Sequence, residues 1–342
     1  MTVASSIRVP ADRRTERRGF YRSLVAVIAC CLGTLAACSA DQPLNPSFSL
    51  TLDDAQAAMK QMKENQVKLR RPVVVVGGYR DPGIGSGNTK ARVERMVNNP
   101  SVLNVPTGMT FTFDQAADRL VDAIEKEFPS DDPNWTTEVD VIGISMGGLV
   151  ARYAAMPVDG PDSKCATAAR ADVGSSATVT ATSSDRTDSS SAGASKNSAA
   201  RTAPVAPDAS DAPPAPAPPA RKRLRVARLF TISSPHRGAK LAPVVFFDPL
   251  AIDMHGGSAF LAKLDAALPD AGYELVPYVR LSDEIVGENN AAPPGMKAWW
   301  VQNQPFQFSH LNCGRDERIL ADIARRLRGE QPYTTSPPAE LP

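Results

Sequence analysis

A serine flanked by glycines, in the stretch GISMG over residues 143–147, is the clearest chemical signal in this 342-residue sequence. A β-branched apolar run over residues 139–144 leads into it, and apolar residues at helical spacing follow it. A serine on a sharp strand-to-helix turn projects its hydroxyl above the sheet, and glycines are needed beside it because a Cβ there would clash with neighbouring backbone. The N-terminus of the next helix would also stabilise negative charge beside the hydroxyl. The pattern therefore predicts Ser145 as a catalytic nucleophile.

Strand-like and helical patterns alternate around this serine. Strands are expected at residues 72–76, 139–144, 225–232, 275–281 and 298–302, with a weaker one at 110–113. Asp114 is a plausible N-cap for an amphipathic helix that reaches Phe128, and residues 312–328 give another helical pattern. Such alternation predicts an α/β fold with a mostly parallel central sheet and helices on both faces.

One segment, residues 159–220, breaks this pattern. It consists mainly of Ala, Ser, Thr, Pro and Asp and ends in a proline-rich run, so it has too few aliphatic and aromatic side chains to offset the entropy of ordering. We expect a disordered insertion, either a passive surface loop or a contact for a polymer or partner. The domain then consists of residues 38–158 and 221–330, and residues 331–342 are expected to form a flexible tail.

The N-terminal residues have the features of an export signal. Arginines precede an apolar stretch, residues 24–37, that is short for a membrane span. The last four residues of this region, Leu35-Ala36-Ala37-Cys38, resemble a bacterial lipobox. We therefore expect residues 1–37 to be removed and Cys38 to be acylated, the alternative being an ordinary secretory signal. Arg17-Arg18 leaves export by the general or the twin-arginine route open.

This reading predicts an extracytoplasmic lipoprotein that is held on a membrane by its N-terminal lipid. The residue after the acylated cysteine, Ser39, is not an acidic inner-membrane retention signal. In a cell with two membranes, the expected location is therefore the outer membrane, the periplasm or the cell surface.

The cysteines and the charges exclude several other functions. Once the signal is removed and Cys38 is acylated, Cys165 and Cys313 remain, either as a disulfide or as two buried thiols. Their spacing suggests no metal site. The net charge is +1, and the basic cluster at residues 221–228 is expected to be a solvated boundary, so no nucleic-acid partner is predicted.

Beyond the serine, several segments resemble the α/β-hydrolase family, and more narrowly its bacterial lipases and esterases. They are residues 73–79, GISMGG at 143–148, TISSPHRG at 231–238 and DMHGGSAFL at 253–261, and the resemblance covers most of residues 70–325 except the insertion. It implies an α/β-hydrolase fold with a small lid or cap segment. It also implies a serine hydrolase of carboxylic, lipid-like acyl esters that needs no cofactor.

The family order of serine, acid and histidine implies the partners of Ser145. It assigns His310 as the base and Asp283 as the acid, with Glu284 as a neighbour that could substitute. The other histidines do not fit, since His236 lies in a loop that the family uses structurally and His255 precedes the acid. Two further carboxylates, Asp248 and Asp270, are expected to be solvated loop or cap residues.

The same resemblance implies an oxyanion hole formed by the backbone amides of Met146 and Tyr79. Gly77 stands where the family more often has histidine. Residues 241–264 are rich in apolar side chains, which suits either a lid or acyl-binding wall or an ordinary cap packed on the core. An acyltransferase with the same acyl-enzyme, and a non-catalytic envelope scaffold, remain as alternative functions.

Overall fold

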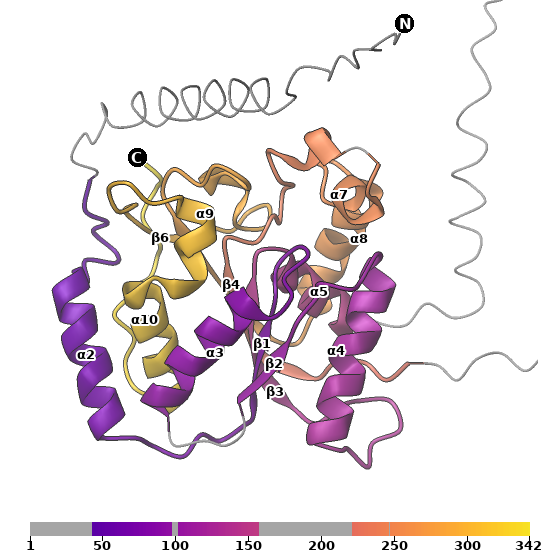
Figure 1. The fold of residues 1–342 in the computed structure, drawn as a ribbon, viewed down its shortest axis with the longest axis horizontal. Helices are drawn as coiled ribbons and strands as arrows, with labels where there is room; N and C mark the ends of the chain where they lie inside the picture. The colour runs from indigo at the N-terminus through magenta and orange to yellow at the C-terminus, as the bar shows by residue number, and fades with distance from the viewer. Residues whose placement is uncertain (1–42, 98–101, 157–220, 246) are drawn as a thin grey trace, which may run out of the picture. The chain divides into compact units, whose positions relative to one another are not determined.

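A six-stranded sheet runs through the part of the chain that the structure, a computed structural model, describes: residues 43–97, 102–156, 221–245 and 247–342 (Figure 1). The predicted signal, Cys38 and the insertion at 159–220 lie outside these residues. The strands are β1 (Val73–Val76), β2 (Val102–Val105), β3 (Val139–Ile144), β4 (Val226–Ile232), β5 (Glu274–Arg280) and β6 (Trp299–Val301). Their order is β2-β1-β3-β4-β5-β6, and every neighbouring pair is parallel. All six strands therefore end at one edge of the sheet.

The order of the strands reverses between β1 and β3. The chain first adds β2 on one side of β1 and then returns to add β3 on the other side, with Val76 paired to Gly143 at the end of the two strands. In parallel sheets such a switch point leaves a crevice outside the carboxyl ends of the two strands, where ligands bind. Ser145 and the loop after β1 lie at this point.

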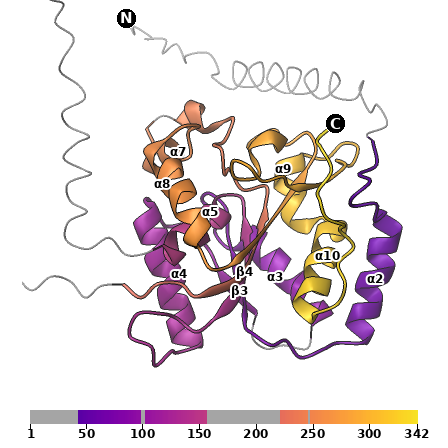
Figure 2. The same ribbon diagram turned by 180° about the vertical axis from the view of Figure 1, so that it is seen from behind.

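Helices cover both faces of the sheet, and Figures 1 and 2 show the two layers from opposite sides. One layer contains α2 (Leu52–Glu64), α3 (Ile84–Met96) and α10 (Glu317–Arg328), and the other contains α4 (Phe113–Glu127), α5 (Met146–Ala155) and α8 (Ala259–Ala267). Alternate residues of β1 face the two layers, since Val73 and Val75 belong to the core on the α10 side and Val74 and Val76 to the core on the α5 side.

The remaining short helices lie in the segments that follow β4, β5 and β6. After β4 come η2 (Ala242–Val245) and α7 (Pro249–Asp253), which precede α8, and we call residues 239–270 the cap segment. η3 (Leu268–Asp270) ends the cap segment, η4 (Glu288–Asn290) lies between β5 and β6, and α9 (Ser309–Asn312) with η5 (Cys313–Arg315) leads into α10. Leu250, Leu261 and Leu264 of the cap segment are buried in the core, so this segment is anchored on the domain.

Two local predictions are wrong. The expected strand at residues 110–113 is irregular chain that leads into α4, whose N-cap is Thr112 and not Asp114. The strand beside β1 is instead β2, a short edge strand that contains Asn104 and is followed by Pro106. β2 has only four residues, its two middle residues are half-buried and one of these is Asn104, so it lacks the continuous apolar run by which the other strands are recognised.

The last residues pack on the domain where the sequence predicts a flexible tail. The buried carboxylate of Asp322 accepts hydrogen bonds from the amides of Tyr333 and Thr334, the latter at 2.9 Å. Further along, the carbonyl of Glu340 accepts a hydrogen bond from the indole of Trp300 at 2.9 Å. These partners are remote in sequence, so the residues of the tail do not reveal them.

The strand order, the helices on both faces and the sharp turn after β3 together define the α/β-hydrolase fold predicted from the sequence. No helix among the described residues is long and apolar enough to cross a bilayer. Within the same residues, His, Cys, Asp and Glu side chains form no group suited to hold a metal ion.

Candidate active site

Ser145 lies on a strained turn between β3 and α5. Its backbone has φ 51° and ψ −123°, a conformation that residues with a Cβ rarely adopt. The Ser145 amide donates to the carbonyl of Ile232 in β4 at 2.8 Å, which holds the turn against the neighbouring strand. The serine is about nine-tenths buried, at 8% exposure, so its hydroxyl lies in a sheltered position at the edge of the sheet.

The glycines around the serine allow α5 to pack directly on the strands. A Cβ on Gly147 would lie 2.4 Å from the carbonyl oxygen of Val76, and one on Gly143 would lie 2.5 Å from the Cα of Gly148. Neither neighbour is a flexible side-chain end, so either substitution would push backbone apart. The steric reason for the glycines that the sequence motif suggests is therefore present in the structure.

The structure brings Ser145, His310 and Asp283 into one hydrogen-bonded line. The Nε2 atom of His310 lies 2.9 Å from the Oγ of Ser145, and its Nδ1 atom lies 2.9 and 3.0 Å from the two carboxylate oxygens of Asp283. Since the ionised carboxylate can only accept, Nδ1 carries the proton and Nε2 is left to accept the serine hydroxyl proton. Ser145 follows β3, Asp283 follows β5 and His310 follows β6, so the parallel sheet places all three at one edge.

Asp283 is buried, at 1% exposure, and is held in its ionised form. Burial alone would raise the pKa of its carboxyl group, but the hydrogen bond and the charge of His310, together with the Val286 amide, outweigh burial and leave the pKa below its ordinary value. The amides of Ile285 and Val286 donate to the Oδ1 atom at 3.1 and 2.8 Å. These bonds fix the orientation of the carboxylate toward His310.

Glu284 has a separate place in the site. Its carboxylate accepts the backbone amide of Ser309 at 3.0 Å and that of His310 at 3.3 Å, and Asp283 is the residue that meets the imidazole. Glu284 thus holds the chain that carries the histidine. The sequence offered it only as a substitute acid, because two adjacent carboxylates differ in role only through the direction in which the backbone points them.

Backbone strain gathers at the same edge. Five non-glycine residues in the described ranges have φ between 51° and 60°, and each follows a different strand: Arg80, Ser145, Ser233, Ser282 and Phe306. Such conformations persist only where the surrounding structure holds them, and they concentrate at functional sites. The strained non-glycine residues of the described chain therefore all lie after the carboxyl ends of strands, at the edge where the candidate active site is formed.

The loop after β1 borders the serine, as the expected oxyanion hole requires. A Cβ on Gly78 would lie 3.2 Å from the Cβ of Ser145. The Gly78 carbonyl accepts hydrogen bonds from the hydroxyl of Thr107 and from the Asp81 amide at 3.1 Å. In a planar trans peptide the next amide points the opposite way, so the N–H of Tyr79 faces away from Thr107 and makes no hydrogen bond to another described residue. Thr107 has no motif that would reveal this role in the sequence.

The second expected donor, the amide of Met146, belongs to the first residue of α5. Amides in the first turn of a helix have no acceptor within that helix, and the helix dipole favours negative charge beside them. Both the first residue of α5 and the loop that contains Tyr79 therefore adjoin Ser145, and the oxyanion hole that these two amides would form stays a prediction.

The other two histidines lie elsewhere. His236 is fully buried, where Arg152 donates to its Nδ1 at 3.0 Å and Thr231 lies 3.0 Å from its Nε2. Burial, followed by the charges of Arg152 and Arg237, holds the pKa of His236 well below its ordinary value, so the ring is a neutral structural group. His255 lies in the cap segment directly after α7.

Cys313 is buried behind the site and is bonded to no other cysteine among the described residues. Burial, with the nearby charge of Asp283, raises the pKa of Cys313 to about 12, so the thiol stays protonated and unreactive. Its candidate partner, Cys165, lies outside the described residues, and the disulfide stays a prediction.

Of the two carboxylates expected to be solvated, Asp270 is exposed but Asp248 is not. Asp248 is 6% exposed and is the N-cap of α7, where its Oδ1 accepts the Leu250 amide at 3.0 Å. Its Oδ2 accepts the phenol of Tyr79 and the guanidinium of Arg80, both at 2.6 Å. The prediction for Asp248 is wrong because its partners lie about 170 residues earlier in the chain, at separations of 168 and 169.

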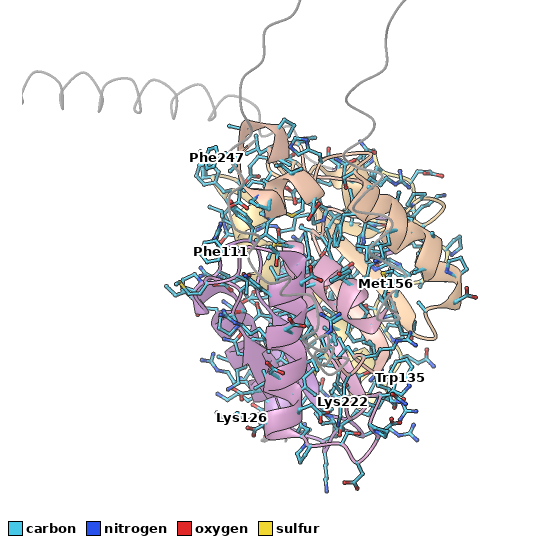
Figure 3. All side chains as sticks on the ribbon, turned by 90° about the vertical axis from the view of Figure 1, so that its right-hand side faces the viewer. Phe111, Lys126, Trp135, Met156, Lys222 and Phe247 are labelled. Atoms are coloured by element: carbon cyan, nitrogen blue, oxygen red, sulfur yellow. The ribbon has the colours of Figure 1, made fainter. Side chains whose placement is uncertain are left out.

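The basic cluster at residues 221–228 is paired with acidic side chains of the domain. Arg221 contacts Asp118 at 2.9 Å, and Lys222 contacts Glu125 at 2.6 Å, both on α4. Figure 3 shows Lys222 toward the end of the domain opposite Phe247, which belongs to the cap segment. These ion pairs link the residues before β4 to α4. They precede a strand, whereas Ser145 follows one, so in this parallel sheet they lie at the edge opposite the serine.

Comparison with known proteins finds similarity in structure only. No protein-family model matches the sequence, and no curated protein matches it. Among solved structures, the mature lipase BlEst2 of Bacillus licheniformis is 11% identical, with 78% of this chain and 92% of that chain covered and a TM-score of 0.41. The phospholipase PlaB of Legionella pneumophila is 11% identical, with 75% of this chain and 60% of that chain covered and a TM-score of 0.44. Lipase B of Aspergillus fumigatus is 14% identical, with 87% of this chain and 62% of that chain covered and a TM-score of 0.42. The chain spans about three fifths of the length of the last two proteins.

Proposed function

We propose that the protein is a serine ester hydrolase that cleaves carboxylic acyl esters through an acyl-enzyme on Ser145. The observation that carries the proposal is the hydrogen-bonded line from Ser145 through His310 to Asp283, with the serine on a strained turn at the start of α5. A nucleophile, a base and a group that orients the base are the three parts that acyl transfer requires.

In the acylation step, Nε2 of His310 takes the Ser145 hydroxyl proton while Oγ attacks the ester carbonyl carbon. The charge that develops on the carbonyl oxygen is stabilised by the amides of Tyr79 and Met146. Asp283 keeps the imidazole in the required tautomer and stabilises the imidazolium. When the tetrahedral intermediate collapses, the bond to the alkoxy oxygen breaks and the imidazolium protonates the departing alcohol.

Deacylation repeats these steps with water. His310 takes a proton from water, hydroxide adds to the acyl carbon, and the same two amides hold the second oxyanion. Collapse breaks the bond to Oγ, and the proton on His310 returns to Ser145. An acyltransferase differs only in that another alcohol replaces water in this step.

A lipid-like substrate is supported by apolar side chains that are exposed on the segments around the serine. They come from the loop before α4, from the cap segment and from the chain beside His310: Met109, Phe111, Leu241, Val244, Phe247, Phe306, Phe308 and Leu311. Soluble proteins rarely expose many large apolar side chains on neighbouring segments unless they bind apolar ligands there. We therefore propose that the acyl group of the substrate is apolar.

Hydrolysis of p-nitrophenyl esters with short and long acyl chains, by the chain beginning at Ser39, tests this function. The proposal expects turnover by the wild type that Ser145→Ala and His310→Ala reduce by at least about 10³-fold, with higher kcat/KM for the longer chains. Added glycerol or a longer alcohol separates hydrolase from acyltransferase, since only a transferase converts most of the substrate into new ester. A folded wild type that hydrolyses no ester would contradict the proposal and leave the binding-scaffold alternative.

For the N-terminal segment we propose export and acylation of Cys38, which would hold the enzyme on a membrane outside the cytoplasm. The support is the arginine-rich start, the apolar stretch and the lipobox-like Leu35-Ala36-Ala37-Cys38. Metabolic labelling with a palmitate analogue in a bacterial host should mark the wild type and not Cys38→Ala. Equal labelling of the two chains would contradict the anchor while leaving the hydrolase proposal intact.

A further inference from the structure

A buried carboxylate links the cap segment to the loop beside Ser145. Asp248 accepts hydrogen bonds from the phenol of Tyr79 and from the guanidinium of Arg80, both at 2.6 Å on Oδ2. Its other oxygen caps α7 through the Leu250 amide. Asp248 therefore connects α7, which is anchored on the core by Leu250, with two consecutive residues of the loop after β1.

These two residues include the proposed oxyanion donor. Tyr79 supplies the amide, and Arg80 directly after it has a left-handed φ of 55°, which a residue with a Cβ keeps only when other contacts hold it. Arg80 is held on three sides, by Asp248, by the carbonyl of Thr110 at 3.2 Å and by the ring of Phe111, whose centroid lies 4.6 Å from the guanidinium carbon. A loop in this conformation depends on its side-chain partners.

The negative charge of Asp248 is paired with the positive charge of Arg80, and the Tyr79 phenol is a neutral donor. Burial alone would raise the pKa of Asp248, but the hydrogen bonds from Tyr79 and Arg80 outweigh it and lower that pKa. Burial and the hydrogen bond to Asp248 raise the pKa of the Tyr79 phenol, which therefore stays protonated and donates. An anionic acceptor makes both bonds stronger than neutral ones.

We propose that Asp248 is a positioning residue for the oxyanion hole, and that it acts through the side chains of Tyr79 and Arg80 to hold the Tyr79 amide toward the oxyanion that forms at Ser145. The inference rests on the proposed function, and it gives one residue of the cap segment, Asp248, a supporting role beside the catalytic machinery. An amide that is misplaced by a fraction of an ångström binds the ground-state ester almost equally well but stabilises the transition state less. Loss of Asp248 contacts therefore lowers kcat and leaves KM nearly unchanged.

Two substitutions separate this role from a structural one. Asp248→Asn keeps the size of the side chain and its ability to cap α7 but removes the charge. Tyr79→Phe removes a single oxygen and leaves the backbone amide in place. Ser258→Ala is the matched control, because Ser258 caps α8 in the same cap segment through the Leu261 amide at 3.2 Å and donates to the Asp253 carbonyl at 2.6 Å. Both of these hydrogen bonds stay within the cap segment.

The test measures kcat and KM for a p-nitrophenyl ester, the affinity for a trifluoromethyl ketone that forms an oxyanion on the serine, and the unfolding temperature. We expect Asp248→Asn and Tyr79→Phe to lower kcat and the affinity for the ketone together, by about 10- to 100-fold, with KM within about twofold. Ser258→Ala should leave kcat within about twofold at a comparable change in unfolding temperature.

Three results would overturn the inference. The first is unchanged kcat and ketone affinity in Tyr79→Phe, which tests the linkage even if Asp248→Asn fails to fold. The second is a loss of kcat in Asp248→Asn that Ser258→Ala reproduces at equal stability. The third is a wild type that hydrolyses no ester, which would overturn the proposed function as well, whereas the first two leave that function standing.

Discussion

At the scale of single residues, Asp283 and Glu284 divide between them two tasks that the histidine requires. Asp283 meets the imidazole at Nδ1, and Glu284 holds the backbone amides of residues 309 and 310. One carboxylate sets the tautomer of His310 and the other sets the place of the chain that carries it.

This division predicts different costs for two conservative substitutions. Asp283→Asn should lower kcat by about 10³- to 10⁴-fold, because an amide that donates to Nδ1 favours the wrong tautomer. Glu284→Gln keeps one acceptor oxygen for the backbone amides and should lower kcat by less than about 10-fold. Ester hydrolysis at saturating substrate measures both. A larger loss in Glu284→Gln than in Asp283→Asn would mean that Glu284 is the acid.

The lowered pKa of Asp283 also predicts how stability depends on pH. A carboxyl group whose pKa is lower in the folded state than the ordinary value of about 3.9 stabilises the fold fully above that value, and the contribution is lost as pH falls through the folded-state pKa. Asn cannot titrate, so the stability advantage of the wild type over Asp283→Asn should shrink as pH falls below about 4. Urea unfolding of both proteins between pH 7 and pH 3 measures this difference. A difference that stays constant over this range would contradict the assignment of an ionised, stabilising Asp283.

At this scale the sequence points to a residue where it has a motif or a family resemblance. The glycine-flanked motif points to Ser145, the family order of serine, acid and histidine implies Asp283 and His310, and the structure brings these three side chains within hydrogen-bond distance. Asp248 and Thr107 could not be found in this way, because their roles rest on contacts with a loop that is remote in sequence.

At the scale of elements, the close packing of α5 on the sheet determines the geometry of the serine. The helix approaches β1 so closely that Gly147 has no room for a methyl group beside the Val76 carbonyl. The first amide of α5 and the hydroxyl of Ser145 therefore have fixed positions relative to β1 and to the loop after it.

Gly147→Ala should destabilise the domain by about 2 to 4 kcal/mol, since the added Cβ would lie 2.4 Å from the oxygen of Val76 and 2.6 Å from that of Gly77. Gly87→Ala is the control, because this glycine lies in α3 with its nearest neighbour, the Asn104 amide nitrogen, 3.6 Å from the added atom. Alanine there should be neutral or stabilise α3 by up to about 1 kcal/mol. Denaturant unfolding measures both changes. Equal stability of the two variants would contradict the close approach of α5 to β1.

Elements with strong apolar patterns were predicted from the sequence, and weakly patterned ones were not. The runs that became β1, β3, β4, β5 and β6 consist mainly of β-branched and aromatic or other apolar residues, most of which are buried. At residues 110–113, threonines and phenylalanines have high strand propensity, but Thr112 instead caps α4 and accepts the Gln115 amide at 3.2 Å. Capping and edge pairing depend on neighbours in space, so local propensity does not determine them.

At the scale of the whole molecule, the two parts of the described domain that flank the predicted insertion are hydrogen-bonded to each other. The amide of Leu224 donates to the carbonyl of Ala154 at 2.9 Å, and the Arg223 guanidinium donates to that of Ala155 at 3.0 Å. The chain thus leaves the domain after α5 and returns before β4 at neighbouring points.

Replacement of residues 157–220 by a linker of about eight Gly and Ser residues, which spans more than about 20 Å when extended, should therefore preserve the domain. We expect an unfolding temperature within a few degrees of the wild type and an unchanged kcat. Cys165→Ser in the full chain is the control for a disulfide to Cys313, whose loss would cost about 2 to 4 kcal/mol. A shortened chain that fails to fold while Cys165→Ser is stable would show that the insertion contributes to the fold.

The central claim is that Ser145 is a nucleophile activated by His310, and covalent labelling tests it most directly. A fluorophosphonate should form one adduct per chain, mapped by peptide mass spectrometry to Ser145, and the adduct should be absent from Ser145→Ala. His310→Ala should react at least about 10²-fold more slowly, because the hydroxyl then lacks its base. Labelling of a folded wild type at other residues only, or no labelling at all, would contradict the account.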